Sequence, residues 1–104
     1  MANAELIADD EENAQGGMAV VKAGNGSVGG HVKLKAGNGE EERGGDIFID
    51  PGKGETDGGD VNVTLPKGDT GRDGLFIIEN MPTADPGVSN ALWSDGGVIK
   101  ISAP

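Results

Sequence analysis

The residue types that perform most enzymatic chemistry are scarce in this chain of 104 residues. It has one histidine, His31, and no cysteine or tyrosine, so a Ser-His-Asp or Cys-His arrangement would have to use His31. His31 directly follows the glycine pair Gly29-Gly30, at a place where later parts of the chain have Asp46 and Asp60. We therefore interpret His31 as a member of an outward-facing polar column. We expect no catalytic residue and no enzymatic activity.

Carboxylates are the remaining candidates for chemistry. Paired carboxylates cleave glycosidic bonds in some enzymes, but here no aromatic platform for stacking a sugar accompanies them. The acidic segments 40–42 and 55–57 carry oxygen ligands of the kind that Ca²⁺ prefers. The glycine pairs, however, continue as GGDIFI and GGDVNV, out of step with the calcium-binding repeat G-G-x-G-x-D. We expect no cofactor and no metal ligand, and a structural cation held by the acidic turns stays an open alternative.

The charge balance limits the partners of the chain. Acidic residues outnumber basic ones 18 to 8, which gives a formal net charge of -10. Such a chain lacks the clustered Lys and Arg that bind a nucleic-acid backbone or an anionic membrane surface. No run approaches the roughly 18 apolar residues of a membrane span, and the opening MANAELIADDEEN has neither the basic nor the long apolar part of a signal peptide. We expect no nucleic-acid partner and no membrane partner.

Glycines divide the middle of the chain into repeated units. Four glycine pairs begin the units at intervals of 13, 15 and 14 residues: Gly16-Gly17, Gly29-Gly30, Gly44-Gly45 and Gly58-Gly59. A G-x-G element follows at a constant offset in the first three units, and in the fourth Pro66 replaces its first glycine while Gly68 keeps the second. The segment KAGNG occurs twice, at 22–26 and 35–39. This constant register is typical of a repeat architecture.

Within each unit, apolar residues fall at every second position, which is typical of a strand with one buried face. The large apolar residues of these positions form the predicted core: Val21, Val32, Leu34, Ile47, Ile49, Val61 and Val63. A polar turn follows each strand, and we expect its first glycine (Gly24, Gly37 and Gly52) to adopt φ > 0, which glycine does without strain.

One apolar strand in about 14 residues cannot enclose a core by itself. We therefore predict an all-β fold, a short glycine-rich β-solenoid or β-prism whose missing walls come from identical chains in a homotrimer. The handedness, and the choice between parallel and interwound strands, stay open.

Three segments flank or follow the repeat at 16–65. Residues 1–15 form an acidic N-terminal arm, either a flexible tail or an anchor whose Leu6 and Ile7 dock on a larger partner. Residues 66–74 have glycine at every third position and are predicted as a collagen-like connector, with a plain turn as the alternative. Residues 75–104 are predicted as a small β cap, which contains a buried strand over 75–78, a last strand from Val98 to Ser102, and three packing residues: Trp93, Ile99 and Ile101.

The end of the chain resembles a known class of proteins. PTADPGVSNALWSDGG, followed by the strand VIKIS, is similar to a C-terminal segment of bacteriophage virion proteins, and PKGDTGRDG resembles the collagen-like pieces of phage fibre and head-decoration proteins. The resemblance covers roughly residues 66–104. It implies a structural virion protein made in the host cytoplasm: a trimeric capsid decoration, cement or head-fibre protein, bound to the major capsid protein or another virion protein. The alternative is a tail or baseplate spike or fibre component that acts at host contact.

Overall fold

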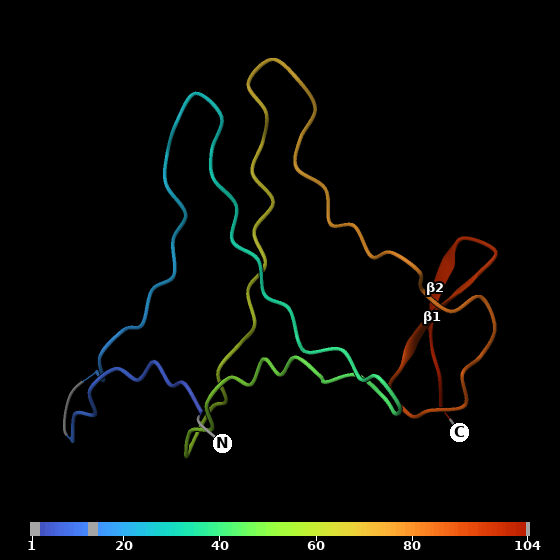
Figure 1. Cartoon of the computed structure of the whole chain (residues 1–104), viewed down its shortest axis with the longest axis horizontal. Coiled ribbons are helices and arrows are strands. Elements are labelled where there is room, and N and C mark those ends of the chain that lie inside the picture. Colours follow the sequence, from blue (N-terminus) through green and yellow to red (C-terminus); the bar gives the residue numbers. More distant parts are fainter. Residues whose placement is uncertain (1–2, 13–14, 104) are drawn as a thin grey trace. The chain divides into compact units, whose positions relative to one another are not determined.

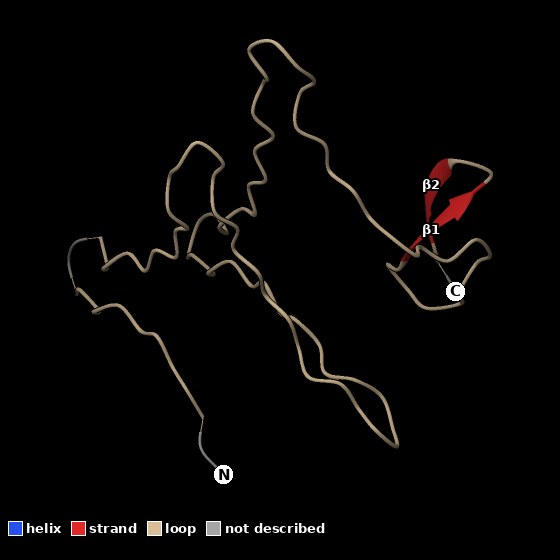
Figure 2. Cartoon of the chain, turned by 45° about the horizontal axis from the view of Figure 1, so that its top comes forward, coloured by secondary structure: helices blue, strands red, loops and turns tan. Residues whose placement is uncertain are grey.

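The computed structural model describes residues 3–12 and 15–103, and these contain no helix. Two strands form one antiparallel sheet near the C-terminus, β1 (Leu92–Asp95) and β2 (Val98–Ile101) (Figure 1). The chain divides into two units, Met1–Gly52 and Lys53–Pro104. Turns and extended backbone, tan in Figure 2, make up the rest of the described chain. The prediction of a non-helical chain with β structure is confirmed, and none of the described residues lies in a helix that could cross a bilayer.

The sheet is a tight hairpin made by two glycines. Gly96 and Gly97 form its two-residue loop, with φ values of 60° and 93°. Positive φ at both central residues is the combination whose twist fits a hairpin, and glycine adopts it without a steric cost. The register pairs Leu92 with Ile101, Trp93 with Lys100, Ser94 with Ile99 and Asp95 with Val98. The last predicted strand is thereby confirmed as β2.

Four turns of the chain close in one recurring way: the backbone N–H of a glycine at the end of the turn donates to a carbonyl oxygen at its start. The four bonds join Gly17 to Asp9 (2.8 Å), Gly30 to Gly24, Gly45 to Gly37 and Gly74 to Pro66 (2.9 Å each). Three of these turns lie in the first unit and one in the second. The segment predicted as a collagen-like connector is therefore, in this chain, a closed turn of the same kind.

The prediction that the first glycine of each G-x-G element adopts positive φ is wrong. Among the described residues, positive φ at glycine is confined to Gly87, Gly96 and Gly97. A Cβ added to Gly24, Gly37 or Gly52 would meet no atom within 4 Å.

The second glycine of each element is the one that the turn requires. An added Cβ there would approach a backbone carbonyl oxygen on the returning side of the turn more closely than real Cβ atoms do. The four clashes are Gly26 with Val28, Gly39 with Arg43, Gly54 with Asp57 and Gly68 with Arg72. This explains why the fourth unit tolerates Pro66 in place of the first glycine and keeps Gly68.

Extended segments join the turns, and the apolar side chains along them are exposed. None of the described apolar residues is buried, and Ser102, with 1% of its surface exposed, is the one buried residue. The predicted buried strand at 75–78 is not found in the single chain, because Leu75, Phe76, Ile77 and Ile78 are all exposed. A chain that buries so little apolar surface gains little of the hydrophobic free energy that normally drives folding.

The two glycines of one turn should therefore respond differently to alanine. We expect Gly39→Ala to destabilise the protein by about 1–3 kcal/mol, because its Cβ forces the returning backbone outward. Gly37→Ala, in the same turn, should be neutral or stabilise by about 0.4–1 kcal/mol, because alanine restricts the unfolded chain. Chemical denaturation of the two variants measures the difference. Equal effects would show that close backbone approach is not what selects glycine here.

Candidate functional site

The predicted core residues are all exposed in the single chain. The exposed fractions of Val21, Val32, Leu34, Ile47, Ile49, Val61 and Val63 lie between 52 and 72%. In extended backbone, residues two apart point to the same side, so these side chains form apolar faces along their segments.

The KAGNG turns hold their polar groups in the same way in both copies. Lys22 Nζ donates to Asn25 Oδ1 at 3.2 Å and to the carbonyl of Ala23 at 3.2 Å. Lys35 Nζ donates to Asn38 Oδ1 at 3.0 Å and to the carbonyl of Ala36 at 3.3 Å. Each lysine thus folds back onto its own turn. The polar side of the segment satisfies itself locally, and the apolar side is left without such contacts.

Two ion pairs in and after the repeat are also local. Arg43 contacts Asp46 at 2.7 Å and Lys67 contacts Asp73 at 3.0 Å, and Asp73 Oδ1 also accepts the N–H of Gly68 at 3.1 Å. These pairs are exposed and contribute little to stability individually. Asp46, one of the carboxylates considered for catalysis, is therefore already paired.

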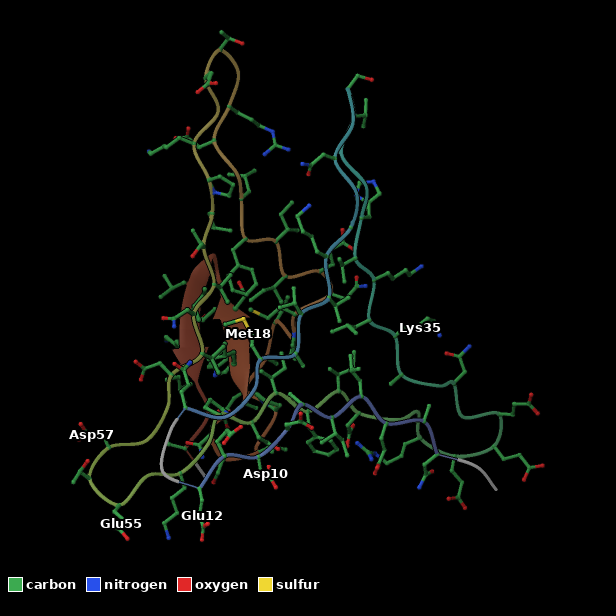
Figure 3. All side chains as sticks on the ribbon, turned by 90° about the vertical axis from the view of Figure 1, so that its left-hand side faces the viewer. Asp10, Glu12, Met18, Lys35, Glu55 and Asp57 are labelled. Carbon is green, nitrogen blue, oxygen red and sulfur yellow. The ribbon has the colours of Figure 1, made fainter. Side chains whose placement is uncertain are left out.

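Residues considered for chemistry or metal binding are not gathered into a site. His31 is exposed, and Figure 3 shows Glu55 and Asp57 pointing away from their turn. Within residues 3–12 and 15–103, no three His, Cys, Asp or Glu side chains lie close enough to hold one metal ion, and no cleft is present.

The C-terminal cap is organised around a contact between Asp85 and Ser102. Asp85 Oδ1 accepts the hydroxyl of Ser102 at 2.6 Å and the backbone N–H of Gly87 at 2.9 Å. Both backbone groups of Ser102 are bonded too, its N–H to Ala91 at 2.8 Å and its carbonyl to the N–H of Asn90 at 2.9 Å. We call the contact between Asp85 and Ser102 the clasp. The sequence does not predict it, because the two residues are 17 positions apart and neither an aspartate nor a serine by itself indicates such a contact.

A turn over residues 88–91 leads from the Asp85 side of the clasp into the hairpin. Ala91 donates to the carbonyl of Val88 at 3.1 Å, and Asn90, with φ of 67°, takes the positive-φ position of that turn. Asn tolerates this conformation better than most residues. Asn90 and Ala91 together oppose Ser102 as a bulge at the end of the hairpin. Ser94 of β1 also donates to the carbonyl of Pro82 at 2.8 Å, which ties the start of the motif to the sheet.

The three predicted packing residues of the cap lie on two different faces of the hairpin. Trp93 is half-buried and opposite Lys100, whose Nζ lies 5.5 Å from the ring centre and also pairs with Asp95. Ile99 and Ile101 point to the other face, and both are exposed. Trp93 therefore packs under a cation rather than beneath the two isoleucines.

The predicted anchor residues lie on an extended segment that ends in one of the recurring turns. Leu6 and Ile7 are exposed, and the bond from Gly17 to Asp9 closes the turn that follows them. Part of the predicted 1–15 arm, residues 1–2 and 13–14, lies outside the described residues. The anchor role itself stays a prediction.

Comparisons of this chain with protein-family models, with curated proteins and with solved structures gave no match.

The contact between Asp85 and Ser102 should make the stability of the cap depend on acid pH. The hydroxyl of Ser102, and then the N–H of Gly87, lower the pKa of Asp85 below its ordinary value. Its contribution to cap stability should be complete above the unfolded pKa of about 3.9 and be lost as the pH falls through the lower folded value. Fluorescence of Trp93, the one tryptophan, reports this loosening in an acid titration.

Two variants separate the clasp from the nearby ion pair. Asp85→Asn keeps an acceptor oxygen but cannot titrate, so the acid transition of Trp93 fluorescence should flatten. Asp95→Asn, which removes the partner of Lys100, should leave that transition in place. If Asp85→Asn titrates like the wild type, the clasp does not set the acid response.

Proposed function

We propose that this chain is a non-catalytic structural protein of a bacteriophage particle that assembles as a homotrimer. The observation that carries the proposal is the regular row of exposed apolar side chains along the extended segments of the repeat. Exposed apolar patches of this extent mark interaction surfaces in soluble proteins. Because the row repeats with the glycine turns, the partner must offer a matching repeat, and a second copy of the same chain has one.

The exposed area supports an obligate assembly. The chain exposes 10229 Å², whereas a compact monomer of 10.5 kDa exposes about 5,400 Å². The excess is about 4,800 Å² for one chain, whereas obligate interfaces bury about 2,000 to 5,000 Å² or more summed over both partners, so one chain alone leaves open an area near the upper end of that range. Association with copies of itself would cover an area of the size that the single chain leaves open.

Three copies fit the pattern better than two. One apolar face in about 14 residues supplies one wall of a core, and three such walls around an axis close it as a triangular prism. The extended segments carry free backbone edges among the described residues, and strands of neighbouring copies could pair with those edges. The fold proposed is therefore a β-prism or interwound β-helix made by three chains.

The charges suit this arrangement. Each chain has a net charge of -10, so association must keep the acidic residues apart. The acidic segment 40–42 lies within the turn closed between Gly37 and Gly45, outside the extended segments that carry the apolar faces. In a prism these turns would stand at the outer corners, in solvent and away from the axis.

The place on the phage particle is proposed from the similarity of the C-terminal segment to virion proteins. We propose a capsid decoration, cement or head-fibre protein whose partner is the major capsid protein or another virion protein. The clasp and the hairpin assign structural roles to Pro82, Asp85, Gly87 and Asn90 of that segment, which supports its use as a folded cap. A tail or baseplate component is the alternative.

A charge placed on the apolar face should disrupt the trimer. Val63→Asp would bury a carboxylate against its symmetry copies, at a cost of several kcal/mol. Thr64→Asp is the matched control, since the neighbouring side chain points to the opposite side of the segment. Gel filtration should show loss of the trimer for Val63→Asp and an unchanged trimer for Thr64→Asp. Equal behaviour of both variants would contradict the assignment of the apolar face.

Antibody labelling of intact particles tests the location. Gold-labelled antibody against the purified protein, viewed on particles of the phage that encodes the chain, should decorate the head. Label confined to the tail or baseplate would favour the alternative. Absence of the protein from purified particles, checked by mass spectrometry, would contradict the proposed virion role.

A further inference from the structure

The N-terminal segment shares the closure of the glycine repeat, although it has no glycine pair before it. Gly17 donates to Asp9 at 2.8 Å, as Gly30 donates to Gly24 and Gly45 to Gly37 at 2.9 Å. The residue just before each acceptor is an alanine: Ala8, Ala23 and Ala36. The first turn therefore has the same start and end as the two turns that follow it in the first unit.

The packing at these three alanines is also the same. A Cβ built on the closing glycine would lie 3.2 Å from the Cβ of Ala8, 3.3 Å from that of Ala23 and 3.4 Å from that of Ala36. All three alanines are half-buried, whereas nearly all the residues around them are exposed. Ala8 thus occupies the position that Ala23 and Ala36 occupy in the repeat.

This equivalence fixes the register of the segment before Ala8. Stepping back by two residues from each alanine gives matching apolar sets: Ala4, Leu6 and Ala8; Ala19, Val21 and Ala23; Val32, Leu34 and Ala36. Leu6 therefore corresponds to Val21 and Leu34, two residues of the predicted core. Ile7 points to the other side, where the neighbouring positions are Glu5 and Asp9.

The far end of the repeat follows the same rule. The bond from Gly74 to Pro66 closes the turn of the fourth unit, and Gly74 stands where the second glycine of a pair stands in the other units. Counting from it places Phe76 and Ile78 in the apolar columns, at the offsets of Val61 and Val63 from Gly59. Both are exposed in the single chain.

We infer that the self-association surface runs over six layers, from residue 4 to residue 78, and that Leu6 lies inside the trimer core. The occupant of this surface is a second and a third copy of the chain. The added segments continue the apolar faces of the repeat, because they present apolar residues at the same offsets next to turns closed by the same kind of hydrogen bond. This inference rests on the proposed function and extends it, and it assigns the N-terminal segment to the assembly in place of an anchor on another virion protein.

A matched pair of charges in the full-length protein tests the inference. Leu6→Asp should dissociate the trimer or lower its melting temperature by at least about 5 °C. Val63→Asp should have the same kind of effect. Ile7→Asp, which adds the same charge on the other side, should shift the melting temperature by less than about 2 °C. Light scattering and thermal melting are measured on both variants and on Val63→Asp.

The outcomes separate this inference from the proposed trimer. If Val63→Asp dissociates the protein while Leu6→Asp matches the wild type, the N-terminal segment lies outside the core and the inference is overturned, as an anchor on another virion protein requires. If neither variant changes a measured trimer, both the inference and the assigned core are wrong.

A second measurement does not depend on a destabilised variant. The natural chain has no cysteine, so Leu6→Cys and Ile7→Cys each introduce a single thiol. A short bismaleimide crosslinker should join copies through Cys at position 6 much faster than at position 7, because only the former faces the axis. Equal rates, or faster linkage at position 7, would overturn the inference.

Discussion

The structure depends on one constraint: its apolar side chains alternate along extended segments and stay exposed in the single chain. Val32, Ile47 and Val63 are each more than half exposed, and the residue between two such positions points to the opposite side. Glycine turns interrupt this pattern about every 14 residues, so the exposed apolar surface recurs at that interval. Under the proposed function, copies of the same chain, which have the same spacing, cover it.

The local parts of the molecule are arranged to leave that surface open. In the turns, the second glycine of each G-x-G element lets the backbone fold back closely, and in four turns of the chain a closing N–H bond holds the two ends together. The lysines of the KAGNG turns bond within their own turns. The cap is closed by Asp85 and Ser102 and by the hairpin. Turns and cap therefore form within one chain, whereas the segments between them keep their apolar side chains exposed.

The parts of this fold that the sequence predicted are those governed by short-range patterns. Alternation and glycine spacing are local, and the β content and strand β2 followed from them. The clasp of Asp85 with Ser102 was missed because it joins residues 17 apart through ordinary side chains. The closure of the N-terminal turn by Gly17 and Asp9 was not predicted, because Asp9 stands where later turns have glycine and the glycine pattern does not reveal it. The prediction of positive φ at the first glycine of each G-x-G element was wrong. The turn requires the second glycine instead, because the backbone approaches it closely, and composition does not show such an approach.

The most direct test of the central claim is the mass of the native protein in solution. Light scattering across a dilution series should give about three times the chain mass of 10.5 kDa, with melting that becomes less cooperative and shifts to lower temperature where the trimer dissociates. A mass of one chain, together with a cooperative thermal transition that does not depend on concentration, would contradict the account. It would show that the exposed apolar faces are buried within a single chain.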